Sequence, residues 1–177
     1  MTRYSESLPV GIVVERRRLD HPWADAAWRP VEVMPGAPAL DGPWPVLAEG
    51  PGFTRWYAGT LDLLAHRRDT ASIRDNLMWE KPQLWVVLRQ TGEGEGGQPW
   101  QPILVTAAPD EAQHCMEAGE DLVEAVDMPE AVAIWLADFV RRMHVEVPVY
   151  KRQRVPAKGG PADPGLPVGA PDRRGRR

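Results

Sequence analysis

The sequence predicts an α+β fold, with an antiparallel sheet or a small open β-barrel flanked by two or three helices. The first hundred residues contain short apolar runs separated by Pro and Gly, which is typical of strands joined by turns. The last third contains segments with helical periodicity and recognisable helix ends. The chain has 177 residues, of which 43% are hydrophobic and 26% are charged, so it is long enough to bury one core.

The first predicted strand is VGIVVERRRL (10–19), whose apolar start gives way to arginines. DHPWADAAW (20–28) carries loop residues, and WRPVEVM (28–34) is the next strand. In that strand Trp28, Val31 and Val33 are only loosely in phase because of Pro30. We therefore expect the stretch LDHPWADAAWRP (19–30) to form a corner between two strands.

A hairpin is predicted for WPVLAE (44–49) and FTRWYAGTLDLLAHR (53–67), which are separated by Gly-Pro-Gly. Strict alternation places one set of side chains on one face of the longer strand: Trp56, Ala58, Thr60, Asp62 and Leu64. It places a second set on the other face: Tyr57, Leu61 and Leu63.

The middle of the chain is mixed. Asp69 or Thr70 can cap a short helix over ASIRDNLMW (71–79). QLWVVLR (83–89) is a buried strand, TGEGEGGQP (91–99) is a flexible loop, and QPILVTA (101–107) is the next strand. We expect these two strands to pair in antiparallel fashion.

A helix is predicted for PDEAQHCMEAG, from Pro109 to its end at Gly119. Its apolar face comprises Ala112, Cys115 and Met116, so Cys115 is interpreted as a small core side chain. DLVEAV (121–126) is a short strand.

The clearest element is DMPEAVAIWLADFVRRMH (127–144), in which Asp127 and Glu130 have the spacing of a capping box. Its apolar stripe has helical periodicity and comprises Val132, Trp135, Leu136, Phe139, Val140 and Met143.

We expect a single α+β domain over residues 5–150 and a disordered, basic, Pro/Gly-rich tail over residues 151–177. The net charge of −4 combines −10 for residues 1–150 with +6 for residues 151–177. The N-terminus lacks the features of a signal peptide, and no apolar run is long enough for a membrane span. The cytoplasm is the predicted location.

Several kinds of chemistry find little support in the sequence. The four histidines lack the spacing of a zinc site, and the one cysteine excludes an internal disulfide. His114 and Cys115 are neighbours, which is not the geometry of a nucleophile and its base. The glycine-rich loop matches no phosphate-binding motif. An acidic body argues against nucleic acid as a partner, although Tyr150 could stack beside the basic tail. No metal and no cofactor is expected.

The chain contains eight tryptophans and two phenylalanines. Tryptophan combines a large apolar face with one N–H donor and is common at interfaces, although most such rings simply cover a core or a sheet. The candidate partner surface comprises Trp23, Trp28 and Trp56, with Lys151, Arg152 and Arg154 on its rim.

Several stretches together resemble an uncharacterised bacterial family of unknown function. They are VGIVVERRRLDHPWADAAWRPVEVMPG, GTLDLLAHRRDTASIRDNL, PQLWVVLR, ILVTAAPDEAQHCMEAGEDLVEAVDMPEAVAIWLADFV and HVEVPVYKRQR, within residues 8–154. The resemblance implies genes that lie in clusters for molybdopterin-dependent oxidoreductases, notably formate dehydrogenases. The family pattern leads us to expect Ser where this chain has Ala108, so the start of the helix at 109–118 is expected to fray.

The expected function is that of a non-catalytic accessory or assembly protein for a molybdenum-dependent oxidoreductase, formate dehydrogenase in particular. It would bind a subunit of that enzyme or a maturation factor. One alternative is a domain that binds a small molecule, a nucleotide or the pterin cofactor, for which Trp stacking and Arg contacts are suited. A further alternative is an enzyme that uses buried carboxylates or Cys115.

Overall fold

The computed structural model describes residues 4–92 and 98–145, and the α+β class is confirmed in them. The elements in chain order are β1 (Ser5–His21), β2 (Ala24–Pro35), β3 (Val46–Gly50), β4 (Phe53–His66), the 3₁₀ turn η1 (Arg67–Asp69), α1 (Thr70–Leu77), β5 (Gln83–Gln90), β6 (Trp100–Thr106), α2 (Pro109–Ala118), β7 (Leu122–Asp127) and α3 (Glu130–Met143). The strands form two antiparallel sheets and, within the described residues, no closed barrel.

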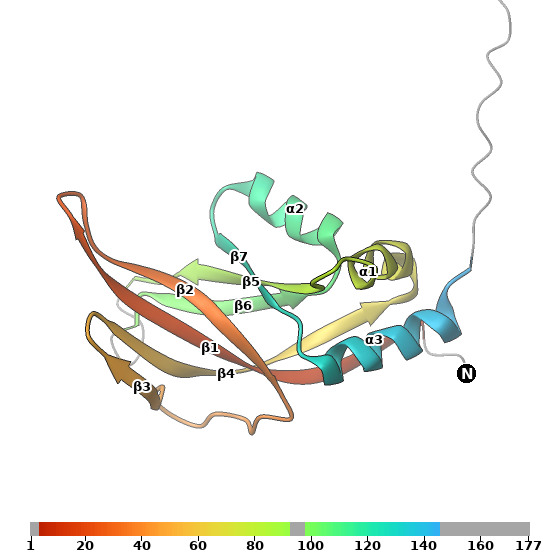
Figure 1. Ribbon diagram of the computed structural model, residues 1–177, viewed down its shortest axis with the longest axis horizontal. Coiled ribbons are helices and arrows are strands. Elements are labelled where there is room, and N and C mark those ends of the chain that lie inside the picture. Colours follow the sequence, from red (N-terminus) through yellow and green to blue (C-terminus); the bar gives the residue numbers. More distant parts are fainter. Residues whose placement is uncertain (1–3, 93–97, 146–177) are drawn as a thin grey trace, which may run out of the picture. The chain divides into compact units, whose positions relative to one another are not determined.

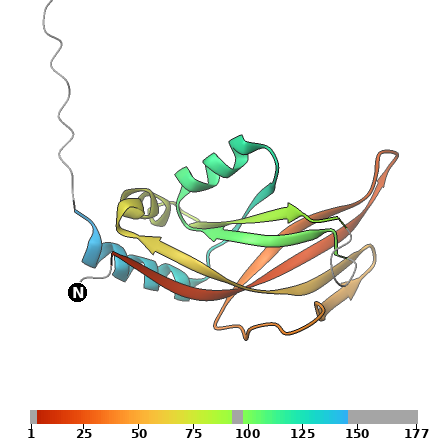
Figure 2. The ribbon, with the colours of Figure 1, turned by 180° about the vertical axis from the view of Figure 1, so that it is seen from behind.

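The strands form one sheet of four strands, sheet A, and one sheet of three strands, sheet B. Sheet A has the strand order β2-β1-β4-β3, and sheet B has the order β6-β5-β7. Sheet B lies over one face of sheet A, and α2 lies on the other side of sheet B (Figures 1 and 2). The predicted pairs β3–β4 and β5–β6 are both present. The late strand β7 completes sheet B by pairing with β5.

The first hairpin is longer and tighter than the sequence predicted. The loop expected at 20–28 is instead a turn at Pro22 and Trp23, because β1 continues to His21 and β2 begins at Ala24. Neither turn residue has a positive φ. Proline fits the second position of such a turn, since its fixed φ suits the turn geometry. The result is a long two-stranded arm at one end of sheet A.

A β-bulge in β4 corrects the predicted faces of that strand. Gly11 pairs with Thr60 and Val13 pairs with Tyr57. Two residues of β4, Ala58 and Gly59, therefore lie opposite the single residue Ile12 of β1. Gly59 has φ +92°, a conformation that glycine adopts without strain. Because of the extra residue, the side chains of β4 that follow the bulge lie on the opposite face from the one that strict alternation predicts. The alternation predicted for 56–64 is therefore wrong across the bulge.

After this correction, the inner face of sheet A, which is turned toward sheet B, carries Trp56 together with Leu61 and Leu63. The outer face carries Tyr57 together with Thr60. The Tyr57 hydroxyl donates a hydrogen bond to the carbonyl oxygen of Pro38, which fixes the loop after β2 against this outer face.

A second irregularity lies in β2 and explains the loose phase seen in the sequence. Val13 pairs with Glu32 and Val14 with Pro30, so Val31 is the extra residue. The bulge brings Trp28 and Val33 onto the same inner face. Proline lacks the N–H that a central strand requires, and β2 accommodates Pro30 because it is an edge strand.

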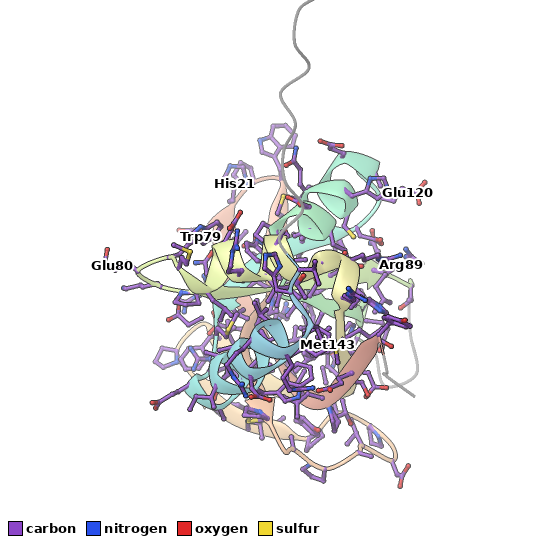
Figure 3. All side chains as sticks on the ribbon, turned by 90° about the vertical axis from the view of Figure 1, so that its right-hand side faces the viewer. His21, Trp79, Glu80, Arg89, Glu120 and Met143 are labelled. Atoms are coloured by element: carbon purple, nitrogen blue, oxygen red, sulfur yellow. The ribbon has the colours of Figure 1, made fainter. Side chains whose placement is uncertain are left out.

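The core lies between the sheets and extends to α1 and α3, and side chains from all of these elements fill it (Figure 3). Its largest fully buried members are Ile12, Leu63, Ile73, Leu84, Leu88, Leu136 and Phe139. Burial of one such side chain contributes about 1.5–3 kcal/mol.

The predicted apolar stripe of α3 is confirmed. Four of its members are buried, and Trp135 and Met143 pack against the core with part of their surface exposed. The predicted capping box is wrong, because the helix begins at Glu130 after Pro129 and has no side-chain cap. Asp127 instead ends β7.

The helix α2 has the predicted bounds, and Gly119 ends it with φ +72°. Its predicted apolar face is only partly correct, since Ala112 is buried, Cys115 is half-buried and Met116 is exposed. The helix start lacks a side-chain cap at Ala108, but the Ser72 hydroxyl accepts a hydrogen bond from the backbone N–H of Asp110 (3.4 Å).

Helix α1 follows η1 and overlaps the predicted helix, but it ends at Leu77 instead of Trp79. Neither predicted cap is present, because the Asp69 side chain makes no capping hydrogen bond and Thr70 is the first residue of the helix. Its buried residue Asn76 ties three segments together. The Asn76 amide nitrogen donates to the carbonyl oxygens of Gln83 and Ala107, both at 2.8 Å, and its oxygen accepts from the N–H of Gln83 at 3.0 Å. This amide joins α1 to β5 and to the end of β6.

The compact unit ends at Val145. The predicted basic tail over 151–177 lies outside the described residues, as do residues 93–97 of the predicted glycine-rich loop, so both remain predictions. Within residues 4–92 and 98–145, no helix is long and apolar enough to cross a membrane.

Candidate functional site

The candidate site is the arm formed by the turn-proximal halves of β1 and β2, together with the start of β4 beside it. Its tip projects beyond the ends of β5 and β6 (Figures 1 and 2). Three features distinguish this arm: an aromatic stack on its inner face, an exposed indole at its tip, and a charged cluster on its outer face.

On the inner face, Trp28 of β2 and Trp56 of β4 stack on each other. Their ring centroids are 5.2 Å apart and their planes differ by 19°. Both rings are half-buried, and Trp28 also packs against the hydrophobic core. The two strands that carry these indoles flank β1, so the stack spans this central strand. Two of the predicted interface tryptophans therefore contact each other.

At the tip, Trp23 is separate from this stack, and 86% of its surface is exposed. Its backbone N–H donates to Nδ1 of His21 at 3.3 Å, which helps to hold the turn. A depression beside the turn is lined by Arg16, Arg18, Leu19, Asp20, His21, Pro22, Asp25 and Gly52. The tip thus combines a free aromatic ring with a polar hollow.

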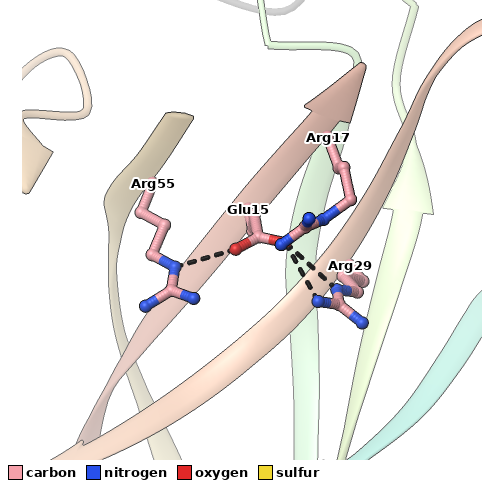
Figure 4. Close-up of polar contacts among 4 residues, drawn as sticks. All are labelled: Glu15, Arg17, Arg29 and Arg55. Carbon is pink, nitrogen blue, oxygen red and sulfur yellow. Dashed lines mark hydrogen bonds and ion pairs between the residues drawn. The ribbon is translucent and has the colours of Figure 1, made fainter. Parts of the chain in front are cut away.

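On the outer face, Glu15 is fully buried and is bound by three arginines (Figure 4). Arg55 Nε donates to Glu15 Oε2 at 2.8 Å. Arg17 Nε and Arg29 Nη2 donate to Glu15 Oε1 at 3.1 and 3.0 Å. We call these four residues the arginine cluster.

The strand register explains how the arginine cluster forms. Glu15 lies in the central strand β1, opposite Arg29 of β2 and opposite Arg55 of β4. Arg17 is two residues further along β1, so its side chain lies on the same face. Four side chains from three strands therefore converge. Arg55 approaches from one side of the carboxylate, and Arg17 and Arg29 approach from the other (Figure 4).

Two opposing effects determine the charge of Glu15. Burial raises its pKa, while the hydrogen bonds from Arg55, Arg17 and Arg29 lower it, and the net shift is downward from the ordinary value of 4.5. Glu15 is therefore ionised at neutral pH. Because one carboxylate faces three guanidinium groups, the cluster carries a local charge of +2.

An aromatic ring supports two of the arginines. The guanidinium carbons of Arg17 and Arg55 lie 5.8 and 5.4 Å from the centroid of the Phe53 ring. The ring itself lies against Gly50, where a Cβ atom would come within 2.3 Å of it. A cation over an aromatic face is attracted to the ring, so Phe53 restricts the positions of both side chains.

The other candidates from the sequence are placed apart from this arm. Burial raises the pKa of the Cys115 thiol, and Glu111 and Asp121 raise it further, which disfavours the thiolate form that nucleophilic attack requires. Nδ1 of His144 lies 3.0 Å from Thr70 Oγ1, and its Nε2 lies 3.0 Å from Arg74 Nη1.

Among the described residues, no group of three His, Cys, Asp or Glu side chains could hold a metal ion. The rim residues Lys151, Arg152 and Arg154 lie outside the described residues, so their place beside the tryptophans remains a prediction.

The sequence reasoning missed the arginine cluster. A signal was present, since Glu15 is the single acidic residue between the apolar run of β1 and Arg16–Arg18. Alternation places Glu15 and Arg17 on one face. Assigning Arg29 and Arg55 to that face requires the strand register, including the bulges.

The molecule is an α+β domain of two packed antiparallel sheets with a charged and aromatic arm. The chain belongs to the family described as a protein of unknown function (DUF3305), whose model matches residues 9–154. Comparisons with curated proteins and with solved structures gave no match.

Proposed function

We propose that this protein is a non-catalytic accessory or assembly protein of the cytoplasm, and that it binds another protein through the tip of the β1–β2 arm. The observation that carries this proposal is the exposure of Trp23, of which 86% is accessible at a projecting turn. Exposed tryptophans dominate the energy of many protein interfaces, because one rigid ring buries a large area.

The charge of the arm indicates the kind of partner. The chain up to residue 150 carries a balance of −10, whereas residues 15–29 of the arm carry four arginines against Glu15, Asp20 and Asp25, a balance of +1. The half-exposed guanidinium group of Arg55 on the outer face adds to this local positive charge. An acidic surface next to an apolar pocket would complement both the arginines and the indole.

The resemblance noted in the sequence gives the finer proposal. The partner is a catalytic subunit or a maturation factor of a molybdenum-dependent oxidoreductase, formate dehydrogenase in particular. The arginine cluster favours a second candidate function, the binding of a small anionic molecule, because its positive charge exceeds that of the carboxylate it neutralises.

The test is affinity purification of the tagged full-length protein from its own cells, grown with molybdate. We expect a molybdoenzyme subunit or its maturation factor at a stoichiometric level. Trp23→Ala should weaken this binding about 30-fold or more, which is typical of a central interface tryptophan. Met78→Ala is the matched control, since Met78 is an apolar side chain that is 77% exposed at the end of α1. Equal recovery with Trp23→Ala, or recovery of no such protein, would contradict the proposal.

A further inference from the structure

We propose that the arginine cluster on the outer face of sheet A is a binding site for a phosphate group, either free phosphate or the phosphate of a small monoester such as a nucleotide. This inference deepens the second candidate function, on which it rests, and is independent of the proposed protein binding, because the site lies on the side of the arm opposite the Trp28–Trp56 stack.

The charge of the arginine cluster is the first argument. A fully buried carboxylate needs compensation, and one or two guanidinium groups are enough to supply it. Glu15 has three, which leaves a charge of +2 on a surface where each arginine side chain is 40–50% exposed. A phosphate dianion matches this surplus, whereas a single carboxylate leaves half of it uncompensated.

The unused donors are the second argument. Arg17 and Arg55 bind Glu15 only through Nε, so both η nitrogens of each guanidinium group are free of hydrogen bonds within residues 4–92 and 98–145. The same holds for Nη1 of Arg29. Glu32 shares this face, opposite Val13, and makes no ion pair with the cluster. Guanidinium forks of this kind bind phosphate oxygens in pairs.

The third argument is that the donors are held in place before any ligand arrives. Glu15 fixes the three Nε ends, and Phe53 supports the guanidinium groups of Arg17 and Arg55. Because these long side chains are already ordered, an anion would bind without the full entropic penalty of immobilising them. The buried carboxylate therefore acts as a positioning group for the donors.

The experiment is a titration of the full-length protein with inorganic phosphate and with AMP at low ionic strength, followed by calorimetry and by ³¹P NMR. We expect saturable binding of both. Arg17→Gln should weaken it about tenfold or more, as is typical of the loss of a charge-assisted contact. AMP should bind more tightly as the pH rises through the second phosphate pKa near 6, since the dianion matches the site.

The matched control is Arg16→Gln, which removes the same charge from the next position of the same strand but on the opposite face of the sheet. A specific site loses affinity with Arg17→Gln and keeps it with Arg16→Gln. Equal losses would indicate general attraction of anions and would overturn the proposal, as would no binding at millimolar phosphate and AMP. Equal affinities for the two ligands would assign binding to the phosphate alone, and tighter AMP binding would assign a contribution to the nucleoside.

Discussion

Two fully buried polar side chains, Asn76 and Glu15, are satisfied in different ways. Asn76 makes three hydrogen bonds, all to backbone groups, and its neutral amide leaves no charge behind. Among the described residues, Glu15 is bound only by side chains, and these bring more positive charge than its carboxylate can neutralise. The contrast distinguishes a polar group that serves the fold from one that organises a surface for something else.

The largest expected effect is on the fold. Asn76→Ala should lower the free energy of unfolding by about 2–4 kcal/mol, because it leaves the backbone groups of Gln83 and Ala107 without their partner. Chemical denaturation measures this loss. The control is Gln113→Ala in α2, whose amide donates an exposed hydrogen bond to Glu117. Its effect should stay within about 0.5 kcal/mol, and a similar loss in both variants would break the comparison.

A smaller effect is expected at Glu15. Glu15→Gln removes the negative charge and leaves three guanidinium groups close together, which should lower the free energy of unfolding by about 1–2 kcal/mol. This loss of stability is smaller than that expected for a fully buried ion pair, because the arginine side chains are 40–50% exposed and water screens their mutual repulsion. Thermal melts with and without phosphate provide the measurement. A loss larger than that of Asn76→Ala would show that Glu15 matters more to the fold than the amide does.

The pH dependence of the free energy of unfolding tests whether Glu15 is ionised in the folded protein. The folded-state pKa of Glu15 is lowered from 4.5, so the unfolded state binds the proton more readily than the folded state. The stabilisation by Glu15 is thus fully present above about pH 4.5 and is lost as the pH falls through the lower, folded-state pKa. The difference between the wild type and Glu15→Gln should shrink below that pH, and a constant difference would contradict an ionised Glu15.

The smallest effect is expected for a single arginine. Arg17→Gln should change the free energy of unfolding by no more than about 0.5–1 kcal/mol, because Glu15 keeps Arg29 and Arg55 and the lost ion pair is half-exposed. Denaturation in phosphate-free buffer tests this. A small loss of stability together with a large loss of phosphate binding would assign Arg17 to ligand binding, while a loss comparable to that of Asn76→Ala would make it structural.

The sequence predicted elements better than it predicted the contacts between them. The apolar stripe of α3 and the Gly119 helix end depend on local periodicity and backbone preference, so they could be identified from sequence alone. The turn at Pro22 and Trp23 could not, because it lacks the Asn-Gly or Asp-Gly pair that usually marks a two-residue hairpin. The predicted capping box is wrong because α3 begins at Glu130, directly after Pro129, so Asp127 lies outside the helix start.

The candidate site shows the same limit. Trp28 and Trp56 were selected as residue types suited to interfaces, but their stacking depends on how three strands align. Arg29 and Arg55 meet Glu15 only because both neighbouring strands are in particular registers. Such registers are set by bulges and turns, for which single residues give weak signals.

The bulge at Ala58 and Gly59 has a consequence for how this chain can vary in length. Up to that point in β4, odd-numbered positions such as Arg55 face outward, and beyond it even-numbered ones such as Thr60 do. Deleting Ala58 or Gly59 would remove the bulge but leave Arg55 and Thr60 on the outer face, whereas deleting a regularly paired residue such as Trp56 would direct Arg55 toward the core. The division between charged and apolar chemistry in this sheet is therefore set by the count of residues as well as by their kind.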